Sequence, residues 1–413
     1  MMKAKVIAWQ ELVKSINTDL WGLPYKLVLN KLRRDTAAVS EIFDGKVLNN
    51  LLDKLFPRRT KERRDDEEEM EWNEEWDIIP VEIFMIKKRK LKKHTAPEVD
   101  GIKALYLRYI NNEMIDYLAN GLNICLKNSV FPTQWKILQL VLLPKGNLNL
   151  EEPKVRPICL LPEIGKMFEK VLVKRMQDWM REHPDTSLAK NQFSFCENKS
   201  TVDAIIELKE FIEETYRNGG VAIAVGLDIS NAFNSLQWTD ICEAVKRKRF
   251  PIYIRKIIVS YLSNRSIIYT NAEGDNTFRI IEARVPQGYV LGPLLWNVTF
   301  DEVLRSGTEK GCRLIAYADD TLIIATGATV ETAKRRANLQ VARTIRKIKE
   351  LHLEIAASKT KVILFTPNKK DFSEIGILVE DEEIKSKRIM KYLGVMKMIN
   401  LLLTSISNIL MLR

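Results

Sequence analysis

The chain has 413 residues, enough for two or three structural units, and its 46% hydrophobic content is that of a globular protein with a sizeable core. Lysine and arginine number 65 against 54 acidic residues. The net charge of +11 suits either a polyanionic partner such as nucleic acid or a well-solvated surface. Five spread cysteines and three histidines lack the spacing of a disulfide framework or a zinc finger. We therefore expect a reduced, intracellular protein of the cytoplasm and nucleus, without an evident targeting signal.

The first part of the chain changes from helical to charged segments. Residues 39–55 place apolar side chains at helical spacing, and Pro57 ends this helix. Residues 58–77, "RRTKERRDDEEEMEWNEEWD", are dense in charge and predict a solvated linker or a surface extension. From Ile78 onward the pattern is that of a globular domain.

The middle of the chain contains helices and one strongly apolar strand. Residues 201–217 predict an amphipathic helix that ends before Gly219 and Gly220. Residues 221–228, "VAIAVGLD", are short, apolar and rich in β-branched residues, which predicts a buried strand. Two helical candidates follow, at 238–262 and 290–304.

A hairpin comes next, because two apolar runs flank a short polar turn within residues 312–327, "CRLIAYADDTLIIATG". A long helix at 331–350 and a strand at 361–366 follow. The order from 221 to 366 is therefore strand, helix, two hairpinned strands, helix, strand, which is the split β-α-β-β-α-β arrangement. In this topology the first strand lies beside the hairpin.

Three carboxylates meet in this arrangement. Asp228 ends the first strand, and Asp319 and Asp320 occupy the hairpin tip. Convergent carboxylates raise one another's pKa unless a cation lies among them, and oxygen ligands suit magnesium. Two such ions about 3.5–4 Å apart can stabilise both the attacking and the leaving oxygen of a phosphoryl transfer. The alternative interpretation of Asp319-Asp320 alone is a polar hairpin turn.

Two further passages have both a functional and a structural interpretation. In "LDISNAF" (227–233), Phe233 could stack under a sugar and exclude a 2′-hydroxyl, or it could be a core side chain. In "VPQGYVLGPLLWN" (285–297), Gly288 permits close approach of the backbone to a ligand, and Gln287 can hydrogen-bond a sugar or base. An ordinary turn explains the same residues.

These passages, in their order and spacing, resemble the palm motifs of reverse transcriptases from non-LTR retrotransposons, which are LINE-like and jockey-like in the broad sense. The wording of residues 292–304 is most similar to arthropod elements that insert into ribosomal RNA genes. The resemblance covers roughly residues 80–395. Further blocks that carry it are "APEVDGI" (96–102), "FPTQWKILQLVLLPK" (131–145), "VRPICLLPEIGKMFEKVLVKRM" (155–176), "QFSFCENKSTVDAI" (192–205), "AASKTKVILF" (356–365) and "KYLGV" (391–395).

The resemblance implies an α+β fold of the right-hand polymerase type, with a βαββαβ palm and mostly helical fingers. It divides the chain into a helical connector (1–57), a charged linker (58–77), fingers with part of the palm (78–220), the catalytic palm (221–366), a palm-to-thumb hairpin (367–395) and a truncated apolar tail (396–413). We interpret this tail as a core helix or a frayed end rather than a membrane anchor, because Asn400, Ser405 and Asn408 interrupt it. We expect no membrane partner; the oligomeric state stays open.

The resemblance also implies residue roles. The catalytic and metal-binding positions are Asp228, Asp319 and Asp320, with the main-chain carbonyl of Ile229 as a further metal contact. The positions implied for nucleotide binding are Lys145, Arg156, Phe233, Gln287, Gly288 and Lys359. Phe233 matches the steric gate, and Arg156 suits phosphate oxygens, although it could also be a buried ion-pair arginine.

The implied reaction is RNA-directed DNA synthesis, in which a primer 3′-hydroxyl attacks the α-phosphate of a deoxynucleoside triphosphate. The cofactors are two Mg²⁺ ions, with Mn²⁺ as a possible substitute. The partners are an RNA template, a DNA primer and dNTPs, held through the phosphate backbone.

The chain departs from the family pattern at several positions. Cys196 stands where an arginine is usual, Ser194 stands for glycine, and Lys361 replaces an acid. Tyr289 replaces a serine beside the nucleotide turn and could obstruct the template base. The chain also lacks the expected endonuclease and thumb segments. The alternative function is therefore a catalytically decayed, nucleic-acid-binding remnant of the same fold.

Overall fold

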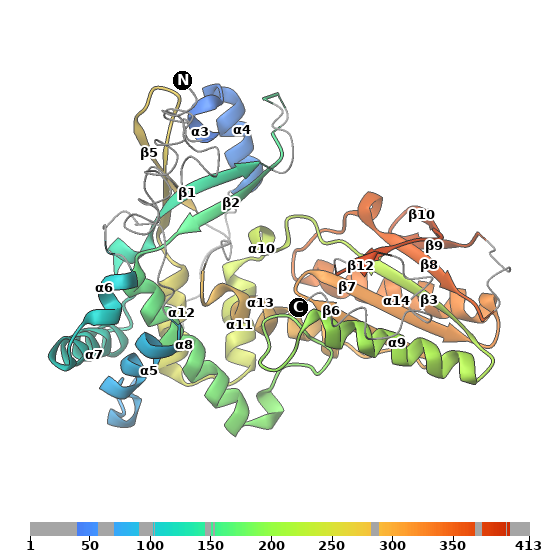
Figure 1. Cartoon of the computed structure of the whole chain (residues 1–413), viewed down its shortest axis with the longest axis horizontal. Coiled ribbons are helices and arrows are strands. Elements are labelled where there is room, and N and C mark those ends of the chain that lie inside the picture. Colours follow the sequence, from blue (N-terminus) through green and yellow to red (C-terminus); the bar gives the residue numbers. More distant parts are fainter. Residues whose placement is uncertain are drawn as a thin grey trace, which may run out of the picture. The chain divides into compact units, whose positions relative to one another are not determined.

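The computed structural model describes residues 39–56, 70–90, 102, 104–144, 150–151, 153–281, 289–367, 374–393 and 395–396 (Figure 1). The chain forms two compact units. Of the described residues, those up to Leu51, within Val141–Arg156 and within Tyr269–Thr277 form the smaller unit, and all others form the larger one. The predicted tail beyond Met396, the linker residues 58–69 and the connector residues 1–38 lie outside the described residues.

One four-stranded sheet has the order β2-β1-β4-β5. Its strands are β1 (Ile137–Pro144), β2 (Val155–Leu160), β4 (Arg265–Thr270) and β5 (Asn276–Ile281). Strands β1 and β4 run parallel, with Ile137 opposite Ser266. The sequence did not predict β4 and β5, because neither strand has a continuous apolar run. Side chains of β4 alternate between buried and half-buried, and those of β5 alternate between exposed and half-buried up to its last residue. Two short helices, α3 (Val39–Ile42) and α4 (Gly45–Leu55), precede these strands in the chain.

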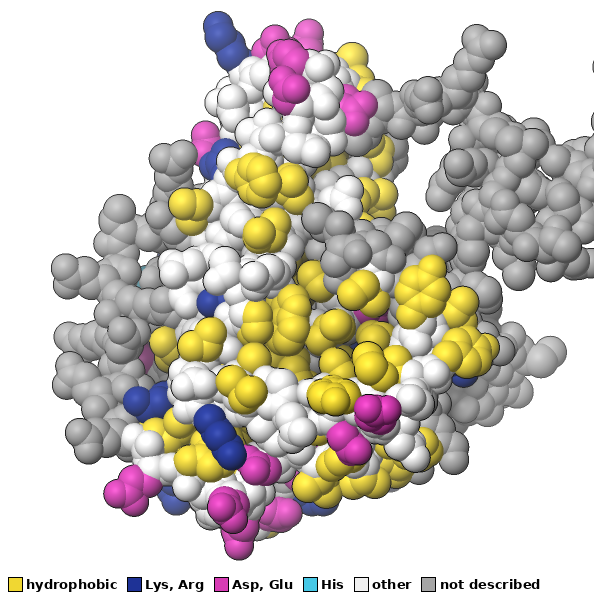
Figure 2. Space-filling model, turned by 90° about the vertical axis from the view of Figure 1, so that its left-hand side faces the viewer, with side chains coloured by type: hydrophobic (Ala, Val, Ile, Leu, Met, Phe, Trp, Pro, Cys, Tyr) yellow, Lys and Arg dark blue, Asp and Glu magenta, His cyan; other side chains and the backbone are white. Residues whose placement is uncertain are grey.

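Several helices of the larger unit pack around one another. They are α5 (Pro80–Lys90), α6 (Ala104–Tyr109), α7 (Asn112–Lys127), α8 (Glu163–Glu182), α11 (Trp238–Arg247) and α12 (Ile252–Leu262). The predicted helix 238–262 is thus two helices, since Pro251 cannot continue a helix and Arg249 adopts a left-handed φ of 52°. Figure 2 shows the side of the molecule on which α5, α6 and α7 lie, where hydrophobic side chains gather; Phe84, Tyr106 and Tyr117 are among the exposed ones.

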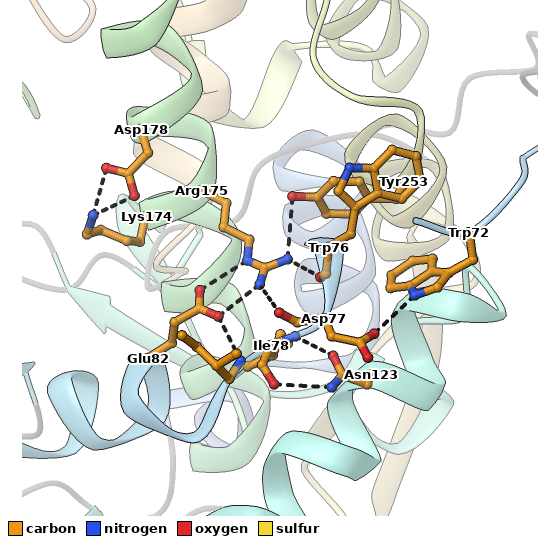
Figure 3. Close-up of polar contacts among 11 residues, drawn as sticks. Trp72, Trp76, Asp77, Ile78, Glu82, Asn123, Lys174, Arg175, Asp178 and Tyr253 are labelled. Atoms are coloured by element: carbon orange, nitrogen blue, oxygen red, sulfur yellow. Dashed lines mark hydrogen bonds and ion pairs between the residues drawn. The ribbon is translucent and has the colours of Figure 1, made fainter. Parts of the chain in front are cut away.

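Residues 70–77, at the end of the predicted charged linker, pack against these helices (Figure 3). The ring centroid of Trp76 lies 4.9 Å from that of Tyr253 on α12. Arg175 on α8 donates hydrogen bonds to the carbonyl oxygens of Trp76 (2.5 Å) and Asp77 (2.9 Å). Asn123 on α7 pairs with both backbone polar groups of Ile78. The tryptophans, these backbone contacts and the ion pair of Asp77 with Lys127 (3.3 Å) hold this segment in place.

The palm contains a four-stranded antiparallel sheet with the order β6-β7-β3-β8. Its strands are β3 (Val221–Leu227), β6 (Cys312–Tyr317), β7 (Asp320–Gly327) and β8 (Lys361–Phe365). Strand β3, the first strand of the predicted β-α-β-β-α-β arrangement, therefore lies beside the β6–β7 hairpin, as that arrangement predicts.

Helices cover both faces of this sheet. Side chains alternate along β3, so Ala222 and Ala224 join the cluster that includes Leu208 and Ile212 of α9 (Thr201–Arg217). Helix α14 (Val330–Glu350) packs against β3 and β7, and its buried side chains lie outside that cluster. It therefore covers the other face, to which Ile223 and Val225 point. The sheet is buried on both faces, which explains the continuous apolar run of β3.

Further elements of the larger unit are α10 (Ala232–Ser235), which follows β3 in the chain, α13 (Gly292–Arg305), which packs against α11 and α14, and η4 (Ala357–Lys359), which precedes β8. After β8, two antiparallel pairs occupy the predicted palm-to-thumb segment: β9 (Gly376–Val379) with β10 (Glu382–Lys385), and β11 (Lys391–Tyr392) with β12 (Val395–Met396). Within the described ranges, every helix is too short or too polar to cross a bilayer.

Candidate active site

The register of β3 and β7 brings Asp228 next to the hairpin tip. Leu227 pairs with Thr321, and on the far side of β7 Asp320 pairs with Tyr317 of β6. Asp228 follows Leu227 in the chain and Asp320 precedes Thr321. Both acidic residues therefore lie one position beyond the last pair of the β3–β7 ladder. The sequence-based topology therefore places Asp228 correctly beside the hairpin.

Asp319 lies between Ala318 and Asp320 in the turn of this hairpin. Ala318 has a φ of 57°, the left-handed region that costs a non-glycine residue about 1 kcal/mol. This conformation makes the turn tight and places two consecutive carboxylates at its tip.

Electrostatic interactions link the three carboxylates. Burial raises the pKa of Asp320, and the charges of Asp319 and Asp228 raise this pKa further. The charge of Lys361 on β8 acts in the opposite direction. A cation near these carboxylates would favour the ionised form of Asp320.

Oxygen donors of this kind fit a hard divalent cation better than a soft one. In the part of the chain that the structure describes, however, no three His, Cys, Asp or Glu side chains already converge as ligands of one ion. A positive charge is already present at the site, because Lys359 Nζ lies 3.4 Å from Asp228 Oδ1.

The backbone around Ile229 is held by the loop before η4. Ser230 N–H donates to the Glu354 carbonyl, and Ala356 N–H donates to the Asp228 carbonyl, each at 2.8 Å. Ile229 and Ile355 thus form the non-hydrogen-bonded pair of this short bridge. The bridge leaves the Ile229 carbonyl unused, as a metal contact at this position requires.

The chain turns sharply after β3 and brings Phe233 back toward the hairpin. Asn231 adopts a left-handed φ of 48°, which asparagine tolerates, and its Oδ1 accepts a hydrogen bond from Asn234 Nδ2 at 2.7 Å. The half-buried ring of Phe233 lies 4.8 Å from the ring of Trp296 on α13, between centroids. Trp296 in turn donates its indole N–H to the Ala318 carbonyl at 3.1 Å. Sequence reasoning missed Trp296.

The other predicted nucleotide-binding residues are only partly described. Arg156 is exposed on β2, in the smaller unit, so it is not the buried ion-pair arginine of the alternative interpretation. Lys145, Gln287 and Gly288 lie outside the described residues.

Tyr289, the first described residue after the nucleotide turn, points into the core. Only 5% of the residue is exposed, and its ring centroid lies 4.5 Å from Cζ of the fully buried Arg265. Glu169 on α8 accepts the N–H groups of Val290 (2.7 Å) and Leu291 (2.9 Å) through Oε2. The expected obstruction of the template base by Tyr289 is therefore wrong. Sequence reasoning also missed Glu169 and Arg265, whose contacts join distant parts of the chain.

Comparisons with known proteins agree with this geometry. Residues 143–396 match the family model of the reverse transcriptase (RNA-dependent DNA polymerase). A Pol polyprotein from the type-1 retrotransposable element R1 of Bradysia coprophila is 25% identical over 96% of this chain and 40% of its own length. A probable RNA-directed DNA polymerase from transposon BS of Drosophila melanogaster is 28% identical over 76% of this chain and 35% of its own length.

A third relative is the RNA-directed DNA polymerase from the mobile element jockey of Drosophila melanogaster, 25% identical over 75% of this chain and 34% of its own length. The chain thus spans two fifths or less of the length of these relatives. Among solved structures, an apo telomerase from Candida tropicalis has a TM-score of 0.44 and 12% identity, over 70% of this chain and 59% of the other.

The family match includes β3, the β6–β7 hairpin and β8, and it covers more than half of the chain. It confirms the resemblance that the palm motifs predicted. The chain belongs to the reverse transcriptase family.

Proposed function

We propose that this chain is the RNA-directed DNA polymerase portion of a retrotransposon protein, which extends a primer 3′-hydroxyl with deoxynucleotides on an RNA template. The observation that carries the proposal is the β3–β7 register, which places Asp228 beside Asp319 and Asp320. The net charge of +11 suits a template–primer duplex held through its phosphates.

A pair of Mg²⁺ ions, or Mn²⁺ in their place, fits the oxygen donors of this site, namely the three aspartates and the Ile229 carbonyl. Such ions, when bound, lower the pKa of the primer hydroxyl and neutralise the leaving pyrophosphate. The protein's own contribution is to hold these oxygens at one edge of a rigid sheet. The raised pKa of Asp320, caused first by burial and then by the charges of Asp319 and Asp228, supports this role of the site.

Phe233 is the proposed steric gate, because its ring is part-buried and lies on the chain segment that leaves Asp228. Lys359, Arg156, Lys145, Gln287 and Gly288 remain proposed nucleotide contacts. Lys359 is supported by its position beside Asp228.

A non-catalytic, nucleic-acid-binding remnant is the second candidate. It is favoured by Cys196, which stands where the family has an arginine and whose half-buried thiol lies 3.8 Å from Asn297 Nδ2. A cysteine side chain is neutral or negative, so it cannot replace the positive charge of an arginine at a phosphate.

Primer extension on an RNA template with Mg²⁺ separates the two candidates. We expect incorporation by the chain, and a loss of about 100-fold or more in Asp228→Asn, because one charged ligand disappears. Asp381→Asn, which changes an exposed acid in the β9–β10 turn, is the matched control and should leave the rate unchanged. RNA binding without any incorporation by the unaltered chain would favour the remnant.

A further inference from the structure

We propose that Trp296 is a positioning residue that sets both the sugar discrimination at Phe233 and the placement of Asp319. The inference rests on the nucleotide- and metal-binding part of the proposed function. Trp296 lies on α13, outside the chain segments that carry Phe233 and Asp319, and it is fully buried.

The first contact of Trp296 is with the proposed gate. The rings of Trp296 and Phe233 lie 4.8 Å apart between centroids at an interplanar angle of 34°. Phe233 also meets Phe195 edge-on, at 6.2 Å between ring centroids. Trp296 is therefore the nearer of the two aromatic supports that limit the rotation of the Phe233 ring.

The second contact is with the catalytic turn. The indole N–H of Trp296 donates to the Ala318 carbonyl at 3.1 Å, in a buried environment. This carbonyl belongs to the peptide unit that links Ala318 to Asp319, so the hydrogen bond fixes the peptide plane next to the Asp319 Cα. The bond also stabilises the left-handed conformation of Ala318, since a buried carbonyl without a partner would cost about 1–3 kcal/mol.

One rigid side chain thus joins two functions that lie on separate segments. An ordinary core tryptophan would contribute packing alone, and its truncation would change the stability of the fold without changing selectivity. The indole N–H and the indole ring can be removed separately, and this allows a direct test of the proposal.

The test uses three variants of the full chain. Trp296→Phe keeps an aromatic ring against Phe233 and removes the hydrogen bond to Ala318. Trp296→Leu removes both contacts. Phe300→Leu is the matched control, because Phe300 is a buried aromatic residue of the same helix that stacks on Trp296 at 5.2 Å.

Two equilibrium measurements avoid any dependence on catalysis. Mn²⁺ affinity is followed by electron paramagnetic resonance of the free ion. Sugar discrimination is the ratio of dUTP to UTP affinity on an RNA template whose DNA primer ends in a dideoxynucleotide, because these two nucleotides differ only in the 2′-hydroxyl. A thermal unfolding midpoint shows for each variant that the protein is folded.

We expect Trp296→Phe to weaken Mn²⁺ binding by about threefold to tenfold and to leave the dUTP/UTP affinity ratio unchanged. Trp296→Leu should also lower this ratio, by about fivefold. Phe300→Leu should change neither quantity, although its unfolding midpoint falls.

The inference is overturned if Trp296→Leu and Phe300→Leu behave alike in both measurements, or if the unaltered chain binds UTP as tightly as dUTP. Extension of an unblocked primer is measured separately. A chain that extends no primer but shows the expected Trp296 effects removes the catalytic proposal and retains this one.

Discussion

Lys359 Nζ lies 3.4 Å from Asp228 Oδ1, so an ammonium group already occupies one oxygen of the acid that ends β3. Both side chains remain partly open to solvent, with 66% of Lys359 and 39% of Asp228 exposed. Ion pairs of this kind contribute little to stability, about 0–1 kcal/mol. The pair is therefore weak enough for a divalent cation to displace it.

We predict that Lys359→Met binds Mn²⁺ more tightly than the unaltered chain, by about twofold to fivefold, because the competing charge is gone. Titration with Mn²⁺ followed by electron paramagnetic resonance measures this change. Lys387→Met, which removes an exposed lysine from another part of the palm, serves as the control. Unchanged or weaker binding in Lys359→Met would show that the lysine does not compete for Asp228.

A second prediction concerns Asp320, whose pKa burial and the charges of Asp319 and Asp228 raise above the ordinary value. The folded state therefore favours the protonated carboxyl. The contribution of this carboxyl to the free energy of unfolding is greatest below the ordinary aspartate pKa of about 3.9. This contribution is lost as the pH rises through the raised pKa of the folded state. Asp320→Asn should thus be more stable than the unaltered chain at pH 7 without metal.

The gain should be small, on the order of 0.5 kcal/mol, because the exposed part of Asp320 keeps its contact with water. Thermal unfolding with a chelator at pH 7 and at acidic pH measures it, and the difference should vanish in acid. Added Mg²⁺ should stabilise the unaltered chain more than the variant. Equal stabilisation of both proteins would contradict a metal site at Asp320.

A third prediction concerns the buried charges beneath the start of α13. Burial raises the pKa of Glu169, and the charge of Arg265 opposes this rise. Glu169→Gln keeps an oxygen for the N–H groups of Val290 and Leu291 but leaves Arg265 without its counter-charge. We expect a loss of about 3 kcal/mol in the free energy of unfolding, measured with urea.

The double variant Glu169→Gln/Arg265→Met is the control for this pair. It removes both charges, so it should be less destabilised than the sum of the two single variants. Strictly additive effects would mean that Glu169 and Arg265 do not stabilise each other.

A fourth prediction concerns Arg175, which binds the carbonyl oxygens of Trp76 and Asp77 and both carboxylate oxygens of Glu82 (Figure 3). Arg175→Leu should destabilise the fold by about 2 kcal/mol, because it leaves these acceptors without a donor. Hydrogen–deuterium exchange should increase over residues 70–78. Arg181→Leu, at an exposed position of the same helix, should leave this exchange unchanged.

The sequence was sufficient to predict the palm because its signals are local. The apolar run of β3 marks a strand buried on both faces, and the two runs around Asp319-Asp320 mark a hairpin. Once the strand order is known, the position of Asp228 follows from antiparallel pairing. The last strand of the palm sheet, at residues 361–365, is likewise marked by a short apolar run.

The contacts around this sheet could not be predicted because they depend on distant residues. Glu169 meets backbone groups more than a hundred residues further along the chain, and no periodicity marks such a contact. Trp296 reads as one more apolar residue of a helix, although its indole N–H reaches Ala318. Residues 70–77 read as charged, and composition cannot show that Trp72 and Trp76 pack against each other and against Tyr253.

Because Leu227 pairs with Thr321, the alignment of the acidic residues depends on the number of residues in β7 more than on which residues these are. A conservative exchange within β7 leaves Asp320 level with Asp228. Loss or gain of one residue between Thr321 and Gly327 would shift the hairpin tip by one strand position, about 3.4 Å, and turn every inward side chain outward. A copy of this gene could therefore accumulate many amino-acid exchanges in these strands and keep its acids aligned, whereas one codon deleted there would separate them.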